Sequence, residues 1–161
     1  MQRFQREGRA LASLKHPHIV SIYDFDVHTD NSYYLVMEYI EGESLKSRLQ
    51  KYADTKSTMP IQEIIQIVVE TARALSYAHG QGMIHRDIKP GNIMLDKNDE
   101  PILTDFGVVK MLSSKSALLH TETGALLGTP AYVSPEQAMG QIGDERSDIY
   151  SLGVVLFQMV T

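Results

Sequence analysis

Three short polar clusters, each on a predicted loop, contain the side chains that could do chemistry. Residues 85–92 read HRDIKPGN and lie between a long predicted helix and a short strand. Residues 105–107 read DFG and directly follow a second short strand. Residues 128–136 read GTPAYVSPE and close a long stretch that shows no sustained periodicity. Such clusters beside strands are where a scaffold usually presents binding and catalytic groups.

A metal pair is predicted where the first two clusters meet. The strands 93–95 and 102–104 flank a polar turn at 96–100, so we expect them to pair as a hairpin. Pairing would bring Asp105 near Asn92. A carboxylate and an amide oxygen are hard ligands of the kind that Mg²⁺ accepts beside phosphate oxygens and water.

Two further groups complete this chemistry. Asp87 lies in the same loop as Asn92 and can accept a proton or orient a hydroxyl. Lys89 adds a positive charge close by. An acid, a base and a metal pair describe a phosphoryl-transfer site, where catalysis is mostly positioning and charge neutralisation.

The element that must position this loop is the strongest predicted helix, over residues 61–78. Gly80 and Gly82 follow it and end it. Its apolar residues recur at intervals of three and four, which indicates a wide buried stripe. The predicted stripe is Ile61, Ile64, Ile65, Val68, Ala72, Leu75 and Ala78.

The remaining elements are shorter, and a chain of 161 residues is predicted to form one domain. Residues 108–133 are rich in Ser, Thr and Gly, and a long stretch without regular structure is usually functional or disordered. The last helix is apolar on nearly all sides, which predicts burial all round. We expect helices over 2–14, over 44–51 and from about 147 onward, strands over 19–25 and 33–39, and a connector at 41–43.

In this order, the three clusters resemble the catalytic loop, the metal-binding DFG motif and the end of the activation segment of serine/threonine protein kinases. The nearest likeness is to the bacterial receptor-kinase type, and it covers essentially the whole chain. The resemblance implies an α+β, protein-kinase-like fold that is incomplete. It would comprise part of the small β lobe (1–37), a hinge (38–43) and the first half of the mainly helical large lobe (44–161), with the activation segment at about 105–136.

The resemblance implies a role for each polar residue of the three clusters. Asp87 would be the catalytic base, and Lys89 would steady the γ-phosphate of ATP. Asn92 and Asp105 would hold Mg²⁺, with Mn²⁺ as an alternative metal. Thr129 would hydrogen-bond toward Asp87 and Lys89. A lysine two residues after the aspartate is the serine/threonine form of this loop.

The same resemblance implies a nucleotide site. Glu7 would pair with the phosphate-clamping lysine, and Met37 resembles the gatekeeper. The backbone of Glu38 and Ile40 would face adenine, and Met94 would line the nucleotide site.

Supporting residues follow from the resemblance in the same way. Asp148 would anchor the catalytic loop from the last helix, and Ser134 would lie where the protein substrate docks. His85 is interpreted as a packed, hydrogen-bonded histidine, because Asp87 already serves as the base. A stacked hydrophobic spine would comprise Leu11, Ile22, His85 and Phe106.

Regulation is implied by the arginine that precedes Asp87, which resembles kinases switched on by phosphorylation of the activation segment. Thr121 and Thr123 are the predicted acceptors. A phosphate there adds about −1.5 to −2 charge and could order the segment by pairing with Arg86 and Lys110.

The chain departs from the family pattern at both ends. No GxGxxG sequence is present, and no lysine among the six residues before Glu7 could be its partner. We also expect partly exposed apolar side chains on the last helix, which is an aggregation liability. These residues are Leu152, Val154, Val155, Leu156, Phe157 and Met159. The hypothesis is that residues 1–161 are part of a working kinase, and the sequence leaves open whether they are active alone.

Composition excludes several classes of function. Lys and Arg number 15 against 20 Asp and Glu, and the resulting charge of −5 argues against binding to nucleic acid or anionic membrane. The absence of cysteine excludes disulfides and thiolate chemistry. No apolar run is long enough to span a bilayer. The expected partners are ATP, protein substrates with Ser or Thr, and a second kinase for autophosphorylation. We expect a cytoplasmic location, with any membrane anchor on sequence beyond this chain.

Two other functions compete with the protein kinase. A small-molecule phosphotransferase of the aminoglycoside-kinase type shares an H-x-D-x-x-x-x-N loop, but the 128–136 segment resembles a docking element for protein substrates. A non-catalytic kinase-like binding module fits the missing glycine loop and lysine. It is opposed by the presence of Asp87, Asn92 and Asp105.

Overall fold

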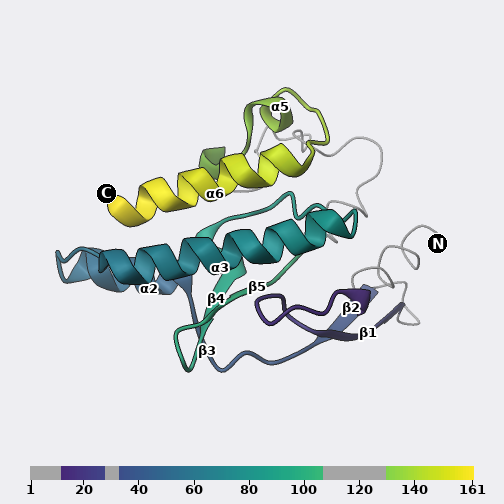
Figure 1. The fold of residues 1–161 in the computed structure, drawn as a ribbon, viewed down its shortest axis with the longest axis horizontal. Coiled ribbons are helices and arrows are strands. Elements are labelled where there is room, and N and C mark those ends of the chain that lie inside the picture. Colours follow the sequence, from purple (N-terminus) through teal and green to yellow (C-terminus); the bar gives the residue numbers. More distant parts are fainter. Residues whose placement is uncertain (1–11, 28–32, 107–129) are drawn as a thin grey trace.

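The computed structural model describes residues 12–27, 33–106 and 130–161 (Figure 1). Two short 3₁₀ turns, Pro90–Asn92 and Pro130–Tyr132, lie among the larger elements. Most of the predicted helix over 2–14 and most of the stretch 108–133 lie outside the described residues. The helices and strands are β1 (Ile22–Val27), β2 (Tyr33–Met37), β3 (Gly42–Ser44), α2 (Leu45–Asp54), α3 (Ile61–Gly80), β4 (Ile93–Asp96), β5 (Pro101–Leu103), α5 (Pro135–Ala138) and α6 (Glu145–Val160).

Helix α3 is the central element, and its prediction is confirmed, although it runs two residues beyond the predicted end at 78 and includes Gly80. It packs against β5 and α6 and buries Ile64, Ile67, Thr71, Ala74, Leu75 and Ala78. The predicted inclusion of Ile61 and Ile65 in the buried stripe is wrong, since each side chain is 55% exposed. Apolar residues cover so wide an arc of this helix that periodicity alone does not fix the centre of its buried face. Tertiary packing selects a face that is rotated from the predicted one toward Ile67, Thr71 and Ala74.

The hairpin predicted between the first two clusters is confirmed. Strands β4 and β5 pair antiparallel, with Ile93 opposite Leu103. Asp96 closes the turn between them, because its Oδ1 accepts from the backbone N–H groups of Asn98 (2.7 Å) and Glu100 (2.9 Å). Such Asx turns are a local reason for the chain to reverse here.

The predicted connector at 41–43 is wrong, because Gly42–Ser44 forms a third strand of this sheet. It pairs antiparallel with β4, with Gly42 opposite Asp96. A Cβ on Gly42 would lie 1.9 Å from the carbonyl oxygen of Leu95. Only glycine allows the two strands to approach this closely.

Strands β1 and β2 form a separate antiparallel pair near one end of α3 (Figure 1). The first strand begins later than its predicted range of 19–25, and the second ends before 39. Ile19 instead makes an isolated parallel bridge to Leu103, where the Val20 N–H donates to the Leu103 carbonyl oxygen (2.9 Å). The segment before β1 is therefore attached to the edge of the β3–β4–β5 sheet.

Helix α2 begins one residue later than predicted and ends at Asp54. Ser44 caps it by accepting the Ser47 N–H at 3.2 Å. Arg48 on this helix hydrogen-bonds the carboxylates of Glu43, Glu63 and Asp99. One side chain thus joins α2 to β3, α3 and the β4–β5 turn.

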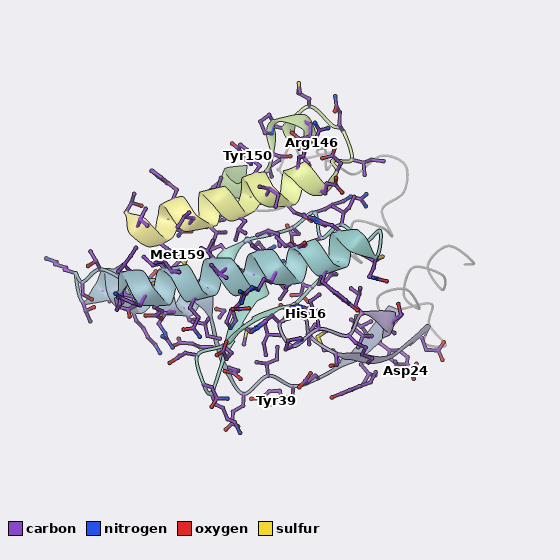
Figure 2. The ribbon with its side chains drawn as sticks, in the orientation of Figure 1. His16, Asp24, Tyr39, Arg146, Tyr150 and Met159 are labelled. Carbon is purple, nitrogen blue, oxygen red and sulfur yellow. The ribbon has the colours of Figure 1, made fainter. Side chains whose placement is uncertain are left out.

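Helix α6 lies beside α3 and runs in the opposite direction (Figure 1). It begins at Glu145, earlier than predicted, because Asp144 and Ser147 form a capping box. Leu152, Val155 and Met159 are buried, and Figure 2 shows Met159 on the side of α6 that faces α3.

The prediction that α6 is buried all round is wrong. Phe157 is 67% exposed, and Leu156 and Val160 are also exposed. The expectation of partly exposed apolar side chains on this helix is confirmed for Val154, Leu156 and Phe157. It is wrong for Leu152, Val155 and Met159, which pack into the core. Among the described residues, no helix is long and apolar enough to cross a membrane.

Candidate active site

The loop His85–Asn92 is held in place by one buried carboxylate on α6. Asp148 is fully buried, and its two oxygens accept the backbone N–H groups of His85 (2.9 Å) and Arg86 (2.6 Å). His79, near the end of α3, directs Nε2 at the same carboxylate (2.8 Å). A buried carboxylate requires donors of this kind, so these contacts fix the start of the loop against both helices. The geometry matches the anchoring contact that was predicted for Asp148.

His85 links this loop to the strand that precedes Asp105. Its ring is fully buried, Nδ1 accepts the Asp87 N–H (3.2 Å) and Nε2 faces the Thr104 carbonyl oxygen (2.9 Å). Because Nδ1 accepts a backbone N–H, the proton of the neutral ring belongs on Nε2. Burial lowers the pKa of His85, against the opposing effects of Asp148, the Thr104 carbonyl, Asp87 and Asp105. His85 is therefore a neutral, packed histidine, as predicted.

The predicted polar group is assembled around the carboxylate of Asp87. Lys89 Nζ lies 2.7 Å from Asp87 Oδ2, and Asn92 Nδ2 donates to the same oxygen at 3.1 Å. Asn92 Nδ2 also donates to the Asp87 carbonyl oxygen (2.9 Å). The turn Pro90–Asn92 closes the loop, with the Asn92 N–H donating to the Lys89 carbonyl oxygen. These contacts orient one carboxylate oxygen of Asp87 and leave Asn92 Oδ1 as an acceptor that can face a cation.

Asp105 lies at the end of the strand that runs beside Asn92. The Thr104 N–H donates to the Asn92 carbonyl oxygen (2.9 Å), so the backbones of the two predicted metal ligands adjoin. Asp105 is exposed and has a positive φ of 57°, a conformation that a non-glycine residue adopts only where its surroundings impose it.

A metal held by Asn92 and Asp105 would need ligands from elsewhere. Among residues 12–27, 33–106 and 130–161, no group of three or more His, Asp or Glu side chains is arranged to hold a metal. The donor set fits a small divalent cation that is carried by phosphate oxygens and keeps several waters, because Mg²⁺ is usually held by only one or two protein carboxylates.

The predicted nucleotide residues lie on β2, on the segment after it and on β4. Met37 ends β2 and is half-buried, and Met94 lies on β4. The Glu38 N–H donates to the Ser21 carbonyl oxygen (2.9 Å), so its own carbonyl is the group that it can offer to a ligand. Ile40 is half-buried and precedes β3.

Two of the four predicted spine residues meet directly. The rings of His85 and Phe106 have their centroids 4.6 Å apart, and both side chains are buried. Ile22 is also buried. The remaining spine residue, Leu11, lies outside the described residues, as do five of the predicted site residues, Glu7, Lys110, Thr121, Thr123 and Thr129.

Residues 130–138 overlap the predicted docking element 128–136 and are called the docking segment below. They are attached to α6 and to the loop His85–Asn92. Ser134 is fully buried and is the N-cap residue of α5. Ser151 donates to the Tyr132 carbonyl oxygen (2.7 Å), and Ser147 hydrogen-bonds Glu136. Gln137 reaches the carbonyl oxygen of Arg86. Sequence reasoning missed Gln137 and His79, since neither stands in a polar cluster and only tertiary structure brings each to its partner.

Comparison with known proteins agrees with this geometry. The model of the protein kinase domain family matches residues 1–161. The chain belongs to the protein kinase domain family. This kinase domain chain is 42% identical over 161 residues to serine/threonine-protein kinase PrkC of Bacillus subtilis, covering 100% of the chain and 24% of that protein.

Other relatives of this kinase domain chain carry similar names. It is 40% identical over 162 residues to serine/threonine-protein kinase PknB of Mycobacterium leprae, covering 99% of the chain and 25% of that protein. It is 42% identical over 163 residues to serine/threonine-protein kinase PksC of Streptomyces coelicolor, covering 99% of the chain and 29% of that protein. The chain therefore spans about a quarter of the length of these curated relatives. The resemblance to bacterial serine/threonine kinases and the protein-kinase-like α+β fold are confirmed.

Proposed function

We propose that this chain carries the catalytic loop of an ATP-dependent protein kinase that phosphorylates Ser and Thr hydroxyls. The observation that carries the proposal is that Lys89 and Asn92 hold the Asp87 carboxylate, in a loop that Asp148 anchors from α6. Phosphoryl transfer depends on positioning and charge neutralisation, and this loop offers both without a covalent intermediate.

Asp87 is assigned the role of the base that accepts or orients the proton of the substrate hydroxyl. Its distance of 2.7 Å from Lys89 places a cation beside the oxygen that would receive the proton. Lys89 is assigned the role of steadying the γ-phosphate of ATP, because a flexible ammonium group can balance the charge on a transferring phosphoryl group.

The metal is proposed to be Mg²⁺, held by Asn92 and Asp105 together with phosphate oxygens of ATP. When bound, it would neutralise charge on the phosphates. Glu38 and Ile40 would meet adenine through their backbones, with Met37 and Met94 beside the ring. Glu7 and Thr129 keep their predicted roles in the nucleotide and catalytic sites as proposals.

Regulation through the segment 107–129 also remains a proposal. Thr121 and Thr123 are the proposed phosphorylation sites, with Arg86 and Lys110 as pairing partners. Arg86 supports this idea, because it directly precedes Asp87 and its backbone N–H is bonded to Asp148. Phosphorylation would occur between two copies of the kinase.

The names of the relatives support a protein substrate. PrkC, PknB and PksC are each named a serine/threonine-protein kinase, which does not favour the small-molecule phosphotransferase. An activity measurement distinguishes the proposed kinase from the remaining alternative, a non-catalytic binding module.

The test is transfer of labelled phosphate from ATP to casein in the presence of Mg²⁺. We expect phosphoserine and phosphothreonine in the product, and a loss of at least about 10³-fold in kcat for Asp87→Asn, because the variant lacks the base. Asp54→Asn is the matched control, since Asp54 is exposed on α2, where its carboxylate accepts a hydrogen bond from Gln50. Equal rates for Asp87→Asn and the control would overturn the proposal.

A further inference from the structure

The residue just before the proposed base, Arg86, is hydrogen-bonded through both its backbone N–H and its backbone carbonyl oxygen. Arg86 has a positive φ of 63°, which is unusual for a residue with a side chain. Its N–H donates to Asp148 Oδ1 (2.6 Å). Its carbonyl oxygen accepts Gln137 Nε2 (3.2 Å). Two contacts from opposite sides therefore hold the backbone conformation that sets the direction of Asp87.

The orientation of the Gln137 amide is fixed by its partners. Gln137 Oε1 receives the Ser134 N–H (3.2 Å), which can only donate. The Ser134 hydroxyl lies 3.1 Å from the same oxygen. The amide nitrogen must then be the atom that faces the Arg86 carbonyl, which can only accept. The Gln137 side chain thus hydrogen-bonds the N-cap residue of α5 and also reaches the catalytic loop.

The packing around Gln137 leaves it little freedom. Gly143 has a φ of 77°, and a Cβ built on it would lie 3.1 Å from Gln137 Cγ. The turn at Gly143 therefore lies against the stem of Gln137. Gln137 also belongs to the docking segment, which Ser147 and Ser151 of α6 hold in place.

We propose that Gln137 is a positioning residue that ties the direction of Asp87 to the arrangement of the docking segment. The inference rests on the proposed kinase function and adds a route by which that site is regulated. When residues 134–138 are seated on α6, the amide of Gln137 holds the left-handed conformation of Arg86. When they are displaced, Arg86 loses one of these two backbone hydrogen bonds, and the backbone that leads into Asp87 is held less firmly.

Two variants separate the bond to Arg86 from the bonds to Ser134. Gln137→Glu keeps an oxygen acceptor for the Ser134 N–H and hydroxyl but removes the donor to the Arg86 carbonyl. Gln137→Met keeps the length of the side chain and removes both. Gln141→Glu is the matched control, because Gln141 is exposed and the substitution makes the same change in charge.

The measurements are kcat, KM for ATP, and hydrogen exchange of backbone amides by mass spectrometry, in the full chain. We expect kcat to fall about tenfold in both Gln137 variants with KM for ATP within about twofold, since a lost hydrogen bond of this kind is worth about one factor of ten. Exchange is expected to rise about tenfold in peptides covering 85–88 and to stay unchanged in peptides from α3. Gln141→Glu should match the wild type.

Each outcome decides the proposal. A wild-type kcat for Gln137→Glu beside a low kcat for Gln137→Met would mean that the cap of α5 matters and the bond to Arg86 does not. Exchange that rises equally across the chain would show a general loss of stability, and either result overturns the proposal. If the wild type transfers no phosphate, the proposed function fails, whereas local exchange at 85–88 still decides whether Gln137 holds Arg86.

Discussion

A single carboxylate, that of Asp148, determines where the proposed catalytic loop begins. It is fully buried and lies within hydrogen-bond distance of three nitrogens, those of His79, His85 and Arg86. A charge with no access to water is tolerated only when its lone pairs are bonded, and here the donors come from α3 and from the loop itself. The Asp148 carboxylate therefore couples α6, which carries it, to α3 and to the proposed catalytic loop.

Asp148→Asn is expected to lower the free energy of unfolding by about 2–4 kcal/mol, because the new NH₂ group would face backbone N–H donors at one of the two positions. The measurement is urea denaturation followed by circular dichroism. Asp54→Asn on the surface of α2 serves as the control and should change stability by less than about 0.5 kcal/mol. A similarly small change for Asp148→Asn would contradict the anchoring role.

Residue types within one loop were predictable from the sequence, and partners far apart in the chain were less so. The grouping of Asp87, Lys89 and Asn92 follows from their spacing, since a tight turn at Pro90–Asn92 must bring them together. The contacts of His79 with Asp148 and of Gln137 with Arg86 join residues 69 and 51 positions apart. Local spacing carries no signal for such pairs, because each depends on tertiary packing.

At the scale of elements, the sheet beside the active site depends on the close approach of β3 to β4. We predict that Gly42→Ala lowers the free energy of unfolding by about 2–3 kcal/mol, because its Cβ would overlap the Leu95 carbonyl oxygen and the obstacle is backbone. The measurement is urea denaturation. Since β4 leads out of the catalytic loop, we expect exchange of the amides at 93–96 to rise as well.

The control for this substitution is Gly153→Ala. Gly153 lies in the interior of α6, and a Cβ there would meet nothing within 4 Å. The same change should raise stability by about 0.5–1 kcal/mol, because alanine is the better helix former. If both variants gained stability, the close approach of β3 to β4 would not be a constraint.

The prediction of elements succeeded where periodicity was long and failed where it was short or ambiguous. Helix α3 has enough turns to be recognised, although its buried face was assigned to Ile61 and Ile65 because both sides of the helix are apolar. Strand β3 has three residues, which is too few to show alternation, and it exists only because β4 is there to pair with it. The start of α6 was set by the capping box at Asp144, a local signal that was available in the sequence.

At the scale of the whole molecule, the described chain is organised around α3. Helix α6 packs along it, the β4–β5 hairpin lies against it, and the β1–β2 pair lies near one end (Figure 1). The segment before β1 is also attached to it, because the His16 ring contacts the ring of Tyr77 on α3 with centroids 5.2 Å apart. The order of the three polar clusters predicted the family and thus this arrangement in outline.

The buried histidine of the catalytic loop makes the stability of the whole molecule depend on pH. Burial lowers the pKa of His85 from its ordinary value of 6.5, so the unfolded chain binds a proton more readily than the folded one. Stability is therefore full above about pH 6.5 and falls as the pH drops below it, by up to about 1.4 kcal/mol per pH unit. Burial and His18 also lower the pKa of His16, against the effect of Glu70, and this lowered pKa adds to the same slope.

We expect urea denaturation to give a lower free energy of unfolding at pH 5.5 than at pH 7.5 for the wild type, and a clearly smaller difference for His85→Phe. The variant should be less stable at pH 7.5, because Thr104 and Asp87 lose a partner. His16→Asn is the control, because it removes only the contribution of His16 to the pH dependence. A His85→Phe variant that kept the full pH dependence would show that the slope arises elsewhere.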